Sequence, residues 1–282
     1  MLTSLLLACT GGTTADPLPT EGSFDVLTYN VQGLPDALSE SDTPTDVRME
    51  QIAPFLDAFD LVGVQEDFDE GNHSLLTALA TQPVKAWAAT VLPDRVYPAG
   101  LGMLSRVGEL VEVVEHNYAL CNGVLSDGSD CLASKGFLAL RLAVGAGSID
   151  VYVTHLDAGG APGDEDARST QVDELLDSIE GWSRGQAVLL MGDTNLRPSD
   201  PPDAVLLARF ADHGLRDVCV ELGCEEDDHI DRFLLRDGDD TALIPTDWRR
   251  DASFVDGAGA DLSDHPALVA TLRWEVTAQS GE

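Results

Sequence analysis

The chain has 282 residues, and 44% of them are hydrophobic, which is enough to bury a sizeable core in one domain. Sixteen Lys and Arg residues stand against 50 Asp and Glu residues, so the formal net charge at pH 7 is −34. This balance excludes non-specific nucleic-acid binding through a broad basic face, because such binding depends on cations that displace the counterions of the polymer. No apolar run approaches the roughly 20 residues that a membrane-spanning helix needs.

The first nine residues, Met1–Cys9, read MLTSLLLAC and resemble a bacterial lipoprotein signal with Cys9 as the lipidated residue. Because the segment has no Lys or Arg and a short apolar core, a frayed apolar N-terminus is the alternative. Residues 10–22 are rich in Thr, Gly and Pro, which is typical of a flexible tether. We therefore expect an exported protein, at the cell surface or extracellular, with a signal and tether at residues 1–21.

Strand and helix signals then alternate along the chain, without an internal repeat or a long linker. The segment 24–30 (FDVLTYN) is typical of a strand, and the segment 46–58 has apolar residues at helical intervals behind Asp46 as a helix cap. Further predicted strands cover residues 61–65, 101–104, 136–142, 149–154, 188–191, 231–235 and 267–273. Further predicted helices cover residues 164–180 and 203–211. The alternation predicts one α/β domain at residues 22–276, followed by a short tail at residues 277–282.

Four cysteines besides Cys9 form two pairs that are close in sequence. In an exported protein, an even number of cysteines favours disulfides. The pairing of Cys121 with Cys131 and of Cys219 with Cys224 is the simplest of the three connectivities. A zinc site is the alternative, which the lack of C-x-x-C spacing disfavours.

Polar side chains stand at the ends of the predicted strands, where rigid elements commonly present functional groups. These residues are Asn30, Glu66, His155, Asp193, Asn195, Asp231, Asp264 and His265. Any one of them alone also fits a turn or a helix cap. Together they would bring carboxylates to one rim, where each close pair repels by about 4 kcal/mol at an intermediate dielectric. Such a rim requires a cation, and its oxygen-rich ligands favour Mg²⁺, Mn²⁺ or Ca²⁺ over zinc.

Six segments occur in an order that points to a known family. They are LTYNVQGLP at 27–35, LVGVQED at 61–67, YVTHLDA at 152–158, LLMGDTNLRP at 189–198, HIDRFLL at 229–235 and LSDHPAL at 262–268. This set resembles the endonuclease/exonuclease/phosphatase superfamily of metal-dependent phosphoesterases. The resemblance implies a layered α/β sandwich of two packed mixed β-sheets flanked by helices, with the catalytic domain at residues 22–276. It also implies hydrolysis of a phosphodiester by in-line attack of activated water.

The same resemblance assigns metal and water-binding roles by position. Glu66 resembles the main metal ligand, with Asn30 and Asp264 beside it or holding its water molecules. Asp193 and Asn195 resemble the pair that orients the attacking water and holds a phosphoryl oxygen. This arrangement fits elementary chemistry, because a cation reduces the repulsion between hydroxide and an anionic phosphodiester.

The resemblance also assigns two histidines to the phosphate. His265 resembles the general base or phosphate-charge stabiliser, and Asp231 the carboxylate that orients it. His155 resembles a second histidine that donates to a phosphoryl oxygen or to the leaving group. Which histidine acts as acid and which as base stays open. A surface ion pair of Asp231 with Arg232 or Arg236, and a core position for His155, are the structural alternatives.

A narrower resemblance, to the bacterial and neutral sphingomyelinases, concerns the substrate. The family pattern is a KG strand, a THLQA segment and an R-x-x-Q helix, which Lys135, Gly136, Arg168 and Gln171 match. Asp157 stands where those enzymes usually have Gln, so specificity for the head group or the ester is open at this position. We interpret Lys135 as a structural or surface lysine.

The resemblance and the net charge together favour a sphingomyelinase or phospholipase C-like reaction on a zwitterionic phospholipid or sphingolipid. A secreted nuclease of the same superfamily is the second hypothesis, and a non-catalytic surface lipoprotein is the third. We expect a monomer. Segments 242–248 (ALIPTDW) and 85–91 (KAWAATV) are candidates for an exposed apolar hairpin that contacts a membrane.

Overall fold

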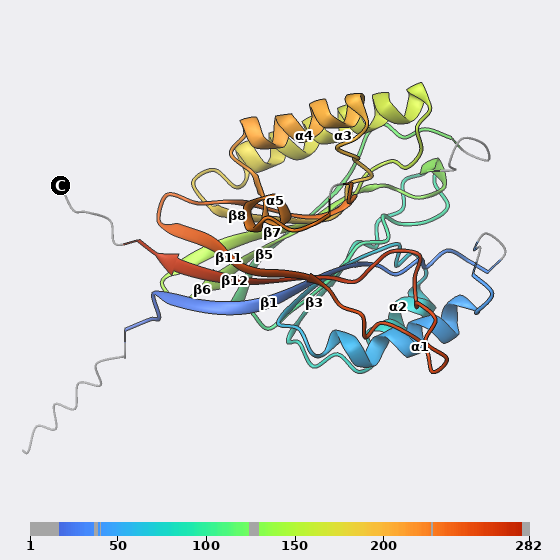
Figure 1. The fold of residues 1–282 in the computed structure, drawn as a ribbon, viewed down its shortest axis with the longest axis horizontal. Helices are drawn as coiled ribbons and strands as arrows, with labels where there is room; N and C mark the ends of the chain where they lie inside the picture. Colours follow the sequence, from blue (N-terminus) through green and yellow to red (C-terminus); the bar gives the residue numbers. More distant parts are fainter. Residues whose placement is uncertain (1–16, 37–38, 40, 124–129, 227, 278–282) are drawn as a thin grey trace, which may run out of the picture.

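Two six-stranded β-sheets form the centre of the molecule, and helices cover both outer faces (Figure 1). The structure is a computed structural model that describes residues 17–36, 39, 41–123, 130–226 and 228–277. The predicted lipidation site Cys9 and the tail beyond Thr277 lie outside these residues. Among the helices within them, none is both long enough and apolar enough to cross a membrane.

The first sheet carries the N-terminal strand at its centre. Its order is β11 (Thr241–Arg250), β12 (Leu268–Val276), β1 (Glu21–Asn30), β2 (Leu61–Gln65), β4 (Gly102–Ser105) and β3 (Val84–Trp87). β1 and β2 run parallel, whereas the other neighbours are antiparallel. β2 is buried along its whole length, which agrees with its unbroken apolar sequence LVGV.

The second sheet has the same mixed character. Its order is β5 (Glu109–Asn117), β6 (Gly136–Val144), β7 (Gly147–His155), β8 (Ala187–Asp193), β10 (Asp231–Arg236) and β9 (Arg216–Asp217). Only β7 and β8 run parallel in this sheet. The alternation of inward and outward side chains along β6 and β7 gives the sheet two apolar faces, one toward the first sheet and one toward the helices.

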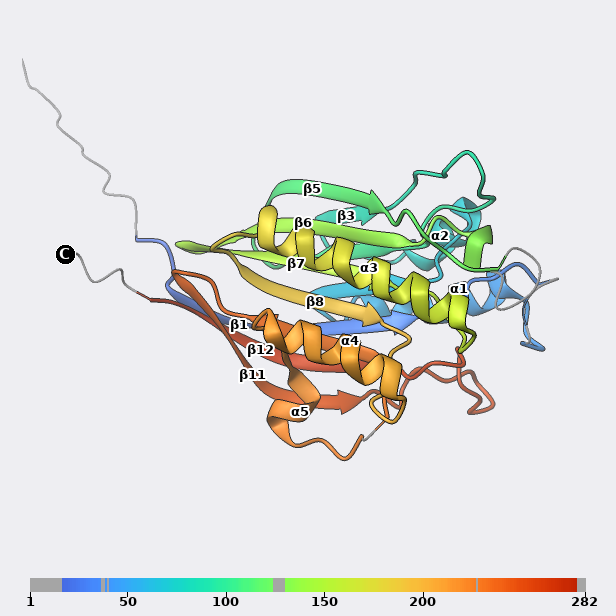
Figure 2. The same cartoon turned by 90° about the horizontal axis from the view of Figure 1, so that it is seen from above.

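Three apolar clusters hold the layers together. Inward side chains of both sheets, such as Val26, Met191 and Phe233, pack between them. A second cluster joins the outer face of the second sheet to α3 (Pro162–Gly181) and α4 (Pro201–Asp212), which lie side by side across it in Figure 2. A third joins the first sheet to α1 (Thr45–Leu56), beside which lies α2 (Glu70–Leu76). The predicted layered α/β sandwich is therefore confirmed.

Some local predictions were wrong. Residues 242–248 form most of β11, which pairs with β12 along its length, so they are no exposed hairpin. Trp87 lies in β3, and its indole donates a hydrogen bond to the Asp67 carbonyl at 2.9 Å. Asp46 lies in the first turn of α1 rather than at its cap, because the helix already begins at Thr45. The sequence also gave no prediction for β5, α2 and the short helix α5 (Val218–Leu222).

Candidate active site

Strand register in the second sheet brings three predicted site residues side by side. Because β7 and β8 run parallel, their last residues, His155 and Asp193, are directly paired. β10 runs antiparallel to β8, so its first residue, Asp231, is paired with Asp193 from the other side. One edge of the sheet therefore presents a row of two carboxylates and an imidazole.

The first sheet contributes a matching pair of residues at the same edge. β1 and β2 run parallel, so Asn30 is paired with Gln65, the residue before Glu66. The Asn30 amide donates to Glu66 Oε1 at 3.1 Å and to Asp193 Oδ2 at 3.2 Å. Its own oxygen accepts a hydrogen bond from the Gln32 backbone N–H at 3.0 Å. Asn30 thus joins the carboxylates of the two sheets, and in this orientation its oxygen faces away from them.

Asp193 lies at the centre of the site. Its Oδ2 is 3.5 Å from His155 Nε2 and 3.6 Å from His265 Nε2, in addition to the contact with Asn30. Its Oδ1 accepts a hydrogen bond from the Asn195 backbone N–H at 2.9 Å. Burial, together with the neighbouring charge of Asp231, raises the pKa of Asp193 to about 7. A carboxylate with such a pKa exchanges its proton near neutral pH.

Asp231 and His265 form a dyad. His265 Nδ1 donates to Asp231 Oδ2 at 2.8 Å, which leaves Nε2 directed toward Asp193. Burial opposes the charged imidazolium, but the hydrogen bond and charge of Asp231 outweigh it and raise the pKa of His265 to about 10. Arg232 and Arg236 pair with other carboxylates, so the alternative of a surface ion pair for Asp231 was wrong.

His155 is buried and contacts a buried lysine. Lys135 Nζ lies 3.0 Å from His155 Nε2 and 2.8 Å from Asp130 Oδ1, and it also donates to the Leu156 carbonyl at 3.0 Å. Burial, with the positive charges of Lys135 and His265, holds the pKa of His155 well below its usual range. Neutral His155 therefore accepts the Lys135 hydrogen bond at Nε2 and carries its proton on Nδ1.

The same contacts revise the interpretation of Lys135. Its side chain is only 4% exposed, so it is no surface lysine. Burial disfavours its charge, but the carboxylates of Asp130 and Asp157 outweigh burial and raise the pKa of Lys135. A permanent cation therefore contacts His155 at Nε2, the ring nitrogen that also lies 3.5 Å from Asp193 Oδ2. Sequence reasoning missed Asp130, because no periodic pattern links it to the strand that follows.

Asp157 has a structural position. It is fully buried, and its carboxylate accepts hydrogen bonds from the Gln171 amide at 2.7 Å and from the Asn122 backbone N–H at 2.6 Å. Arg168 donates to the Asp157 carbonyl and pairs with Asp203. Asp157, Arg168 and Gln171 thus fix the loop after β7 to α3. The Asp157 carboxylate accepts hydrogen bonds from groups inside the protein.

Asn195 and Asp264 complete the predicted set at its margins. The Asn195 amide donates to the Leu156 carbonyl at 3.0 Å. Asp264 is exposed, and its Oδ1 accepts from Ser263 Oγ at 3.3 Å. Within the described part of the chain, Asp264 makes no hydrogen bond to Glu66, although its charge contributes to the raised pKa of Glu66. The structure therefore gathers seven of the eight residues by direct contact and places Asp264 nearby.

Backbone strain is concentrated at the site. Of the residues described, three other than glycine have a positive φ: Gln32 at 50°, Glu66 at 62° and Asn195 at 51°. Each such conformation costs roughly 1–3 kcal/mol and persists only where its surroundings fix it. Gly33 packs so closely against the Glu66 carbonyl that a Cβ would lie 2.1 Å from it. The sequence gave no sign of this strain.

The donor atoms fit a divalent metal ion. The ligand atoms of Asp193 and Asp231 lie within 4.8 Å of each other, and Glu66 faces them across Asn30, whereas the protonated His265 offers no lone pair to a metal. Burial is the main reason that the pKa of Glu66 is raised, with Asp264 adding to it. A cation would relieve the repulsion within this group, and carboxylate oxygens suit Mg²⁺ and Mn²⁺.

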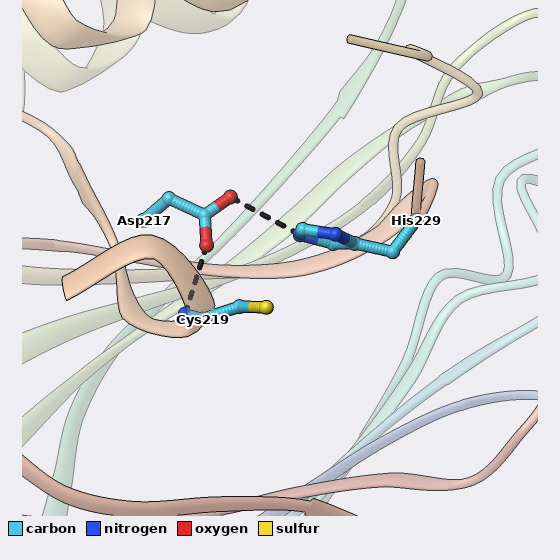
Figure 3. A group of neighbouring side chains, drawn as sticks. All are labelled: Asp217, Cys219 and His229. Carbon is cyan, nitrogen blue, oxygen red and sulfur yellow. Dashed lines mark hydrogen bonds and ion pairs between the residues drawn. The ribbon is translucent and has the colours of Figure 1, made fainter. Parts of the chain in front are cut away.

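A second group with metal-ligand residue types lies beside α5 (Figure 3). Here Asp217 Oδ2 is 3.4 Å from His229 Nε2, and Asp217 Oδ1 accepts from the Cys219 backbone N–H at 2.9 Å. Cys219 is bonded to Cys224, which, with the Cys121–Cys131 bond, confirms the simplest predicted pairing. The thiolate that a metal would need is therefore absent from this group.

Comparison with known proteins places the chain in a family. The model of the Endonuclease/Exonuclease/phosphatase family matches residues 27–265. The chain belongs to this family, as its six ordered segments predicted.

The relatives include sphingomyelinases. The sphingomyelinase of Mycobacterium tuberculosis is 28% identical over 277 residues, which cover 92% of this chain and 54% of that protein. The chain thus spans about half the length of the curated relatives it matches. The predicted similarity to this branch is confirmed.

Two solved structures extend the comparison. Sphingomyelinase C from Streptomyces griseocarneus has a TM-score of 0.64 and 21% identity, covering 89% of this chain and 99% of that one. A double mutant of beta toxin from Staphylococcus aureus, with bound magnesium ions, has a TM-score of 0.66 and 16% identity, covering 88% and 99%. At these identities the likeness establishes the fold.

Proposed function

We propose that the chain is a divalent-metal-dependent phosphodiesterase with a sphingomyelinase or phospholipase C-like reaction. The observation that carries the proposal is the meeting of Glu66, Asp193 and the Asp231–His265 dyad at one edge of the two sheets. The similarity of 92% of the chain to a sphingomyelinase supports the choice of substrate. A non-catalytic lipoprotein would have no need to keep all these groups together.

Glu66, Asp193 and their neighbours would hold the cation, with Asn30 orienting both carboxylates. A divalent cation at this position neutralises charge on the phosphodiester and makes water more acidic. We infer that Mg²⁺ is the ion, with Mn²⁺ or Ca²⁺ as alternatives, from the oxygen-rich donors.

The side chains around Asp193 divide the proton chemistry. Asp193, whose Oδ2 lies 3.5 Å from His155 Nε2 and 3.6 Å from His265 Nε2, would orient the attacking water beside the cation. His265, protonated at neutral pH and fixed by Asp231, donates a hydrogen bond from Nε2 to a phosphoryl oxygen. The two groups differ in charge because Asp231 supports the imidazolium and opposes ionisation of Asp193. Asn195 fixes the Asp193 carboxylate through its backbone N–H.

Lys135 and His155 would form the rear wall of the site. The ammonium lies 3.0 Å from His155 Nε2, the ring nitrogen that is also 3.5 Å from Asp193 Oδ2, so its positive charge would act on an anionic phosphate bound beside Asp193. Asp130 keeps the lysine charged and in place. We propose that the Lys135 charge stabilises the anionic phosphate, and that neutral His155, whose Nε2 accepts from Lys135, orients the ammonium.

A cavity beside the dyad provides room for the rest of the substrate. It has a volume of about 250 Å³ and reaches from Asp231 and His265 to Trp248, Arg197 and Arg250. Trp248 offers an aromatic face, while the two guanidiniums are each paired with an acid, Arg197 with Asp228 and Arg250 with Glu226. This mixture of aromatic, cationic and anionic groups favours a compact zwitterionic head group over a long polyanion.

We also propose that the protein acts outside the cytoplasm, with Cys9 as a membrane anchor. The two disulfides support an oxidising compartment. The catalytic groups all come from one chain, so activity as a monomer requires no partner subunit.

Hydrolysis assays test the proposal. Sphingomyelin, phosphatidylcholine and linear DNA are offered side by side, with Mg²⁺, Mn²⁺ or Ca²⁺ and with EDTA. We expect phosphocholine release from sphingomyelin that EDTA and Glu66→Gln abolish, while the exposed control variant Glu70→Gln keeps it. Cleavage of DNA alone would replace the lipid substrate by a nuclease function, and no turnover of any substrate would contradict the proposed activity.

A further inference from the structure

Arg48 of α1 reaches the turns that carry the site. Arg48 is 2% exposed, and among the residues that the structure describes its guanidinium donates only to oxygens without formal charge. Nη1 donates to the Val31 carbonyl at 3.0 Å and to the Leu262 carbonyl at 3.1 Å. Nη2 donates to the Gln32 carbonyl at 2.6 Å, and Nε to the Thr43 carbonyl at 3.4 Å.

Burying the Arg48 guanidinium among uncharged oxygens costs free energy, which a residue with a merely structural role would not need to spend. Within the described part of the chain, no carboxylate lies within ion-pair distance of Arg48. Burial lowers the pKa of Arg48, and the nearby charges of Asp264 and Glu66 oppose this effect. Because burying a charge without a close counter-ion is unfavourable, the geometry of its hydrogen bonds has to compensate.

The carbonyls that Arg48 binds belong to two turns of the candidate active site. Val31 and Gln32 directly follow Asn30, and Leu262 lies three residues before His265. The two turns also touch each other, because Ser263 Oγ donates to the Asn30 carbonyl at 2.6 Å. Arg48 is therefore a common point of attachment for segments that are more than 200 residues apart in sequence.

The contact with Gln32 has a specific consequence. Gln32 adopts a positive φ of 50°, which aims its backbone N–H at Asn30 Oδ1. This hydrogen bond turns the Asn30 amide so that its NH₂ group faces Glu66 and Asp193. By holding the Gln32 carbonyl, Arg48 fixes the strained turn that orients Asn30.

We propose that Arg48 is a positioning residue that fixes the Asn30–Gln32 and Leu262–His265 turns relative to each other and thereby sets the spacing of Glu66 from the Asp231–His265 dyad. Lysine cannot reproduce this, because Nη1 holds one carbonyl of each turn while Nη2 holds the Gln32 carbonyl, and the single ammonium of a lysine lacks this planar arrangement of donors. The inference rests on the proposed function where Mn²⁺ affinity or activity is the readout, whereas thermal unfolding and the His265 resonance do not depend on it.

The test compares Arg48→Lys and Arg48→Met with Arg106→Met in the full chain. Arg106 is a matched control, because its guanidinium is also hydrogen-bonded, to Asp57 and Thr81, but is 35% exposed. Three quantities are measured: thermal unfolding, Mn²⁺ affinity by calorimetry, and the NMR resonance of the His265 Nδ1–H. Where wild type hydrolyses a phosphodiester, kcat and KM are added.

We expect Arg48→Lys to stay folded, to bind Mn²⁺ about 10- to 100-fold more weakly and to shift the His265 resonance. Its kcat should fall by a similar factor with KM little changed, because the reacting groups are misplaced while the substrate pocket stays intact. If Arg48→Met unfolds, Arg48→Lys decides. Wild-type Mn²⁺ affinity and an unshifted resonance in folded Arg48→Lys would overturn the inference. If wild type neither binds Mn²⁺ nor hydrolyses a phosphodiester, the proposed function is overturned instead. The His265 resonance then still tests whether Arg48 positions the dyad.

Discussion

Two groups of Asp and His side chains can be compared: the Asp231–His265 dyad at the start of β10, and Asp217 with His229 beside α5. They differ in the third side chain that contacts the histidine. In the Asp231–His265 dyad, His265 Nε2 faces a further carboxylate, Asp193, at 3.6 Å. In the group of Figure 3, the Arg232 guanidinium lies 2.7 Å from Asp217 and 2.9 Å from His229. A guanidinium where a metal ion would bind makes the second group structural.

Proton placement separates the two groups further. His229 Nδ1 donates to the Glu226 carbonyl, and its Nε2 lies between the Arg232 guanidinium and the Asp217 carboxylate. His265 instead donates from Nδ1 to a carboxylate, which favours the charged ring. The partner of Nδ1 is thus a carbonyl in one group and a carboxylate in the other, and the carboxylate stabilises a charged ring.

Replacing each histidine in turn is the strongest way to break this comparison. His265→Ala should lower kcat by about 10²- to 10⁴-fold without unfolding the protein, because it removes the group fixed by Asp231. His229→Ala should keep kcat near that of wild type. Steady-state kinetics with circular dichroism as a fold control measure both. Wild-type turnover in folded His265→Ala would remove this residue from the mechanism.

Removing the central cation of the second group should affect stability. Arg232→Met leaves the Asp217 carboxylate in a largely buried position without its ion-pair partner. The free energy of unfolding should fall by about 3–5 kcal/mol, measured by urea denaturation. Arg216→Met serves as the control, since Arg216 also pairs with acids but is 40% exposed. Equal losses in the two variants would contradict the assignment of Arg232 as the core of this group.

The pH dependence of metal binding sharpens the comparison. Asp193 has a raised pKa of about 7, and the pKa of Glu66 is also raised, so protons compete with the cation below neutrality. Mn²⁺ affinity should therefore rise by about tenfold per pH unit up to about pH 7 and then level off, as measured by calorimetry. A Mn²⁺ affinity that does not change with pH below neutrality would show that no carboxylate with a raised pKa takes part in binding.

The smallest expected effect is on the stability that Asp217, in the group beside α5, contributes at acidic pH. Burial opposes ionisation of Asp217, but His229 and Arg232 outweigh it and lower the pKa of Asp217 below 3.8. A carboxylate with a lowered folded pKa stabilises the fold above its unfolded pKa and loses this contribution as the pH falls through the folded pKa. The stability difference between wild type and Asp217→Asn should shrink below about pH 3.8 in urea denaturation. A difference that grows on acidification would contradict the pKa shift.

Much of the fold, and the meeting of the predicted side chains at one edge of the sheets, followed from the sequence. Strands such as Leu61–Gln65 end at polar residues, and parallel pairing brings such ends to one edge. β11 was missed because Pro245 and exposed polar residues interrupt its strand pattern. The burial of Lys135 and Asp157 was not predicted, because it depends on partners elsewhere in the chain, such as Asp130 and Asn122.

Arg48 was beyond any local pattern. In sequence it is one charged residue on an amphipathic helix, and its partner Leu262 is 214 residues away. The positive φ angles of Glu66 and Asn195 are equally invisible, because neither residue is a glycine. Sequence thus identifies the groups that do chemistry more readily than the groups that hold them in place.

The most direct test of the central claim is calorimetric titration of Mn²⁺ into wild type, Glu66→Gln and Asp217→Asn. The account predicts that Glu66→Gln abolishes binding and that Asp217→Asn leaves it unchanged, because the metal centre lies between the two sheets. Binding that survives in Glu66→Gln and disappears in Asp217→Asn would place the metal beside α5 and contradict the proposed active site.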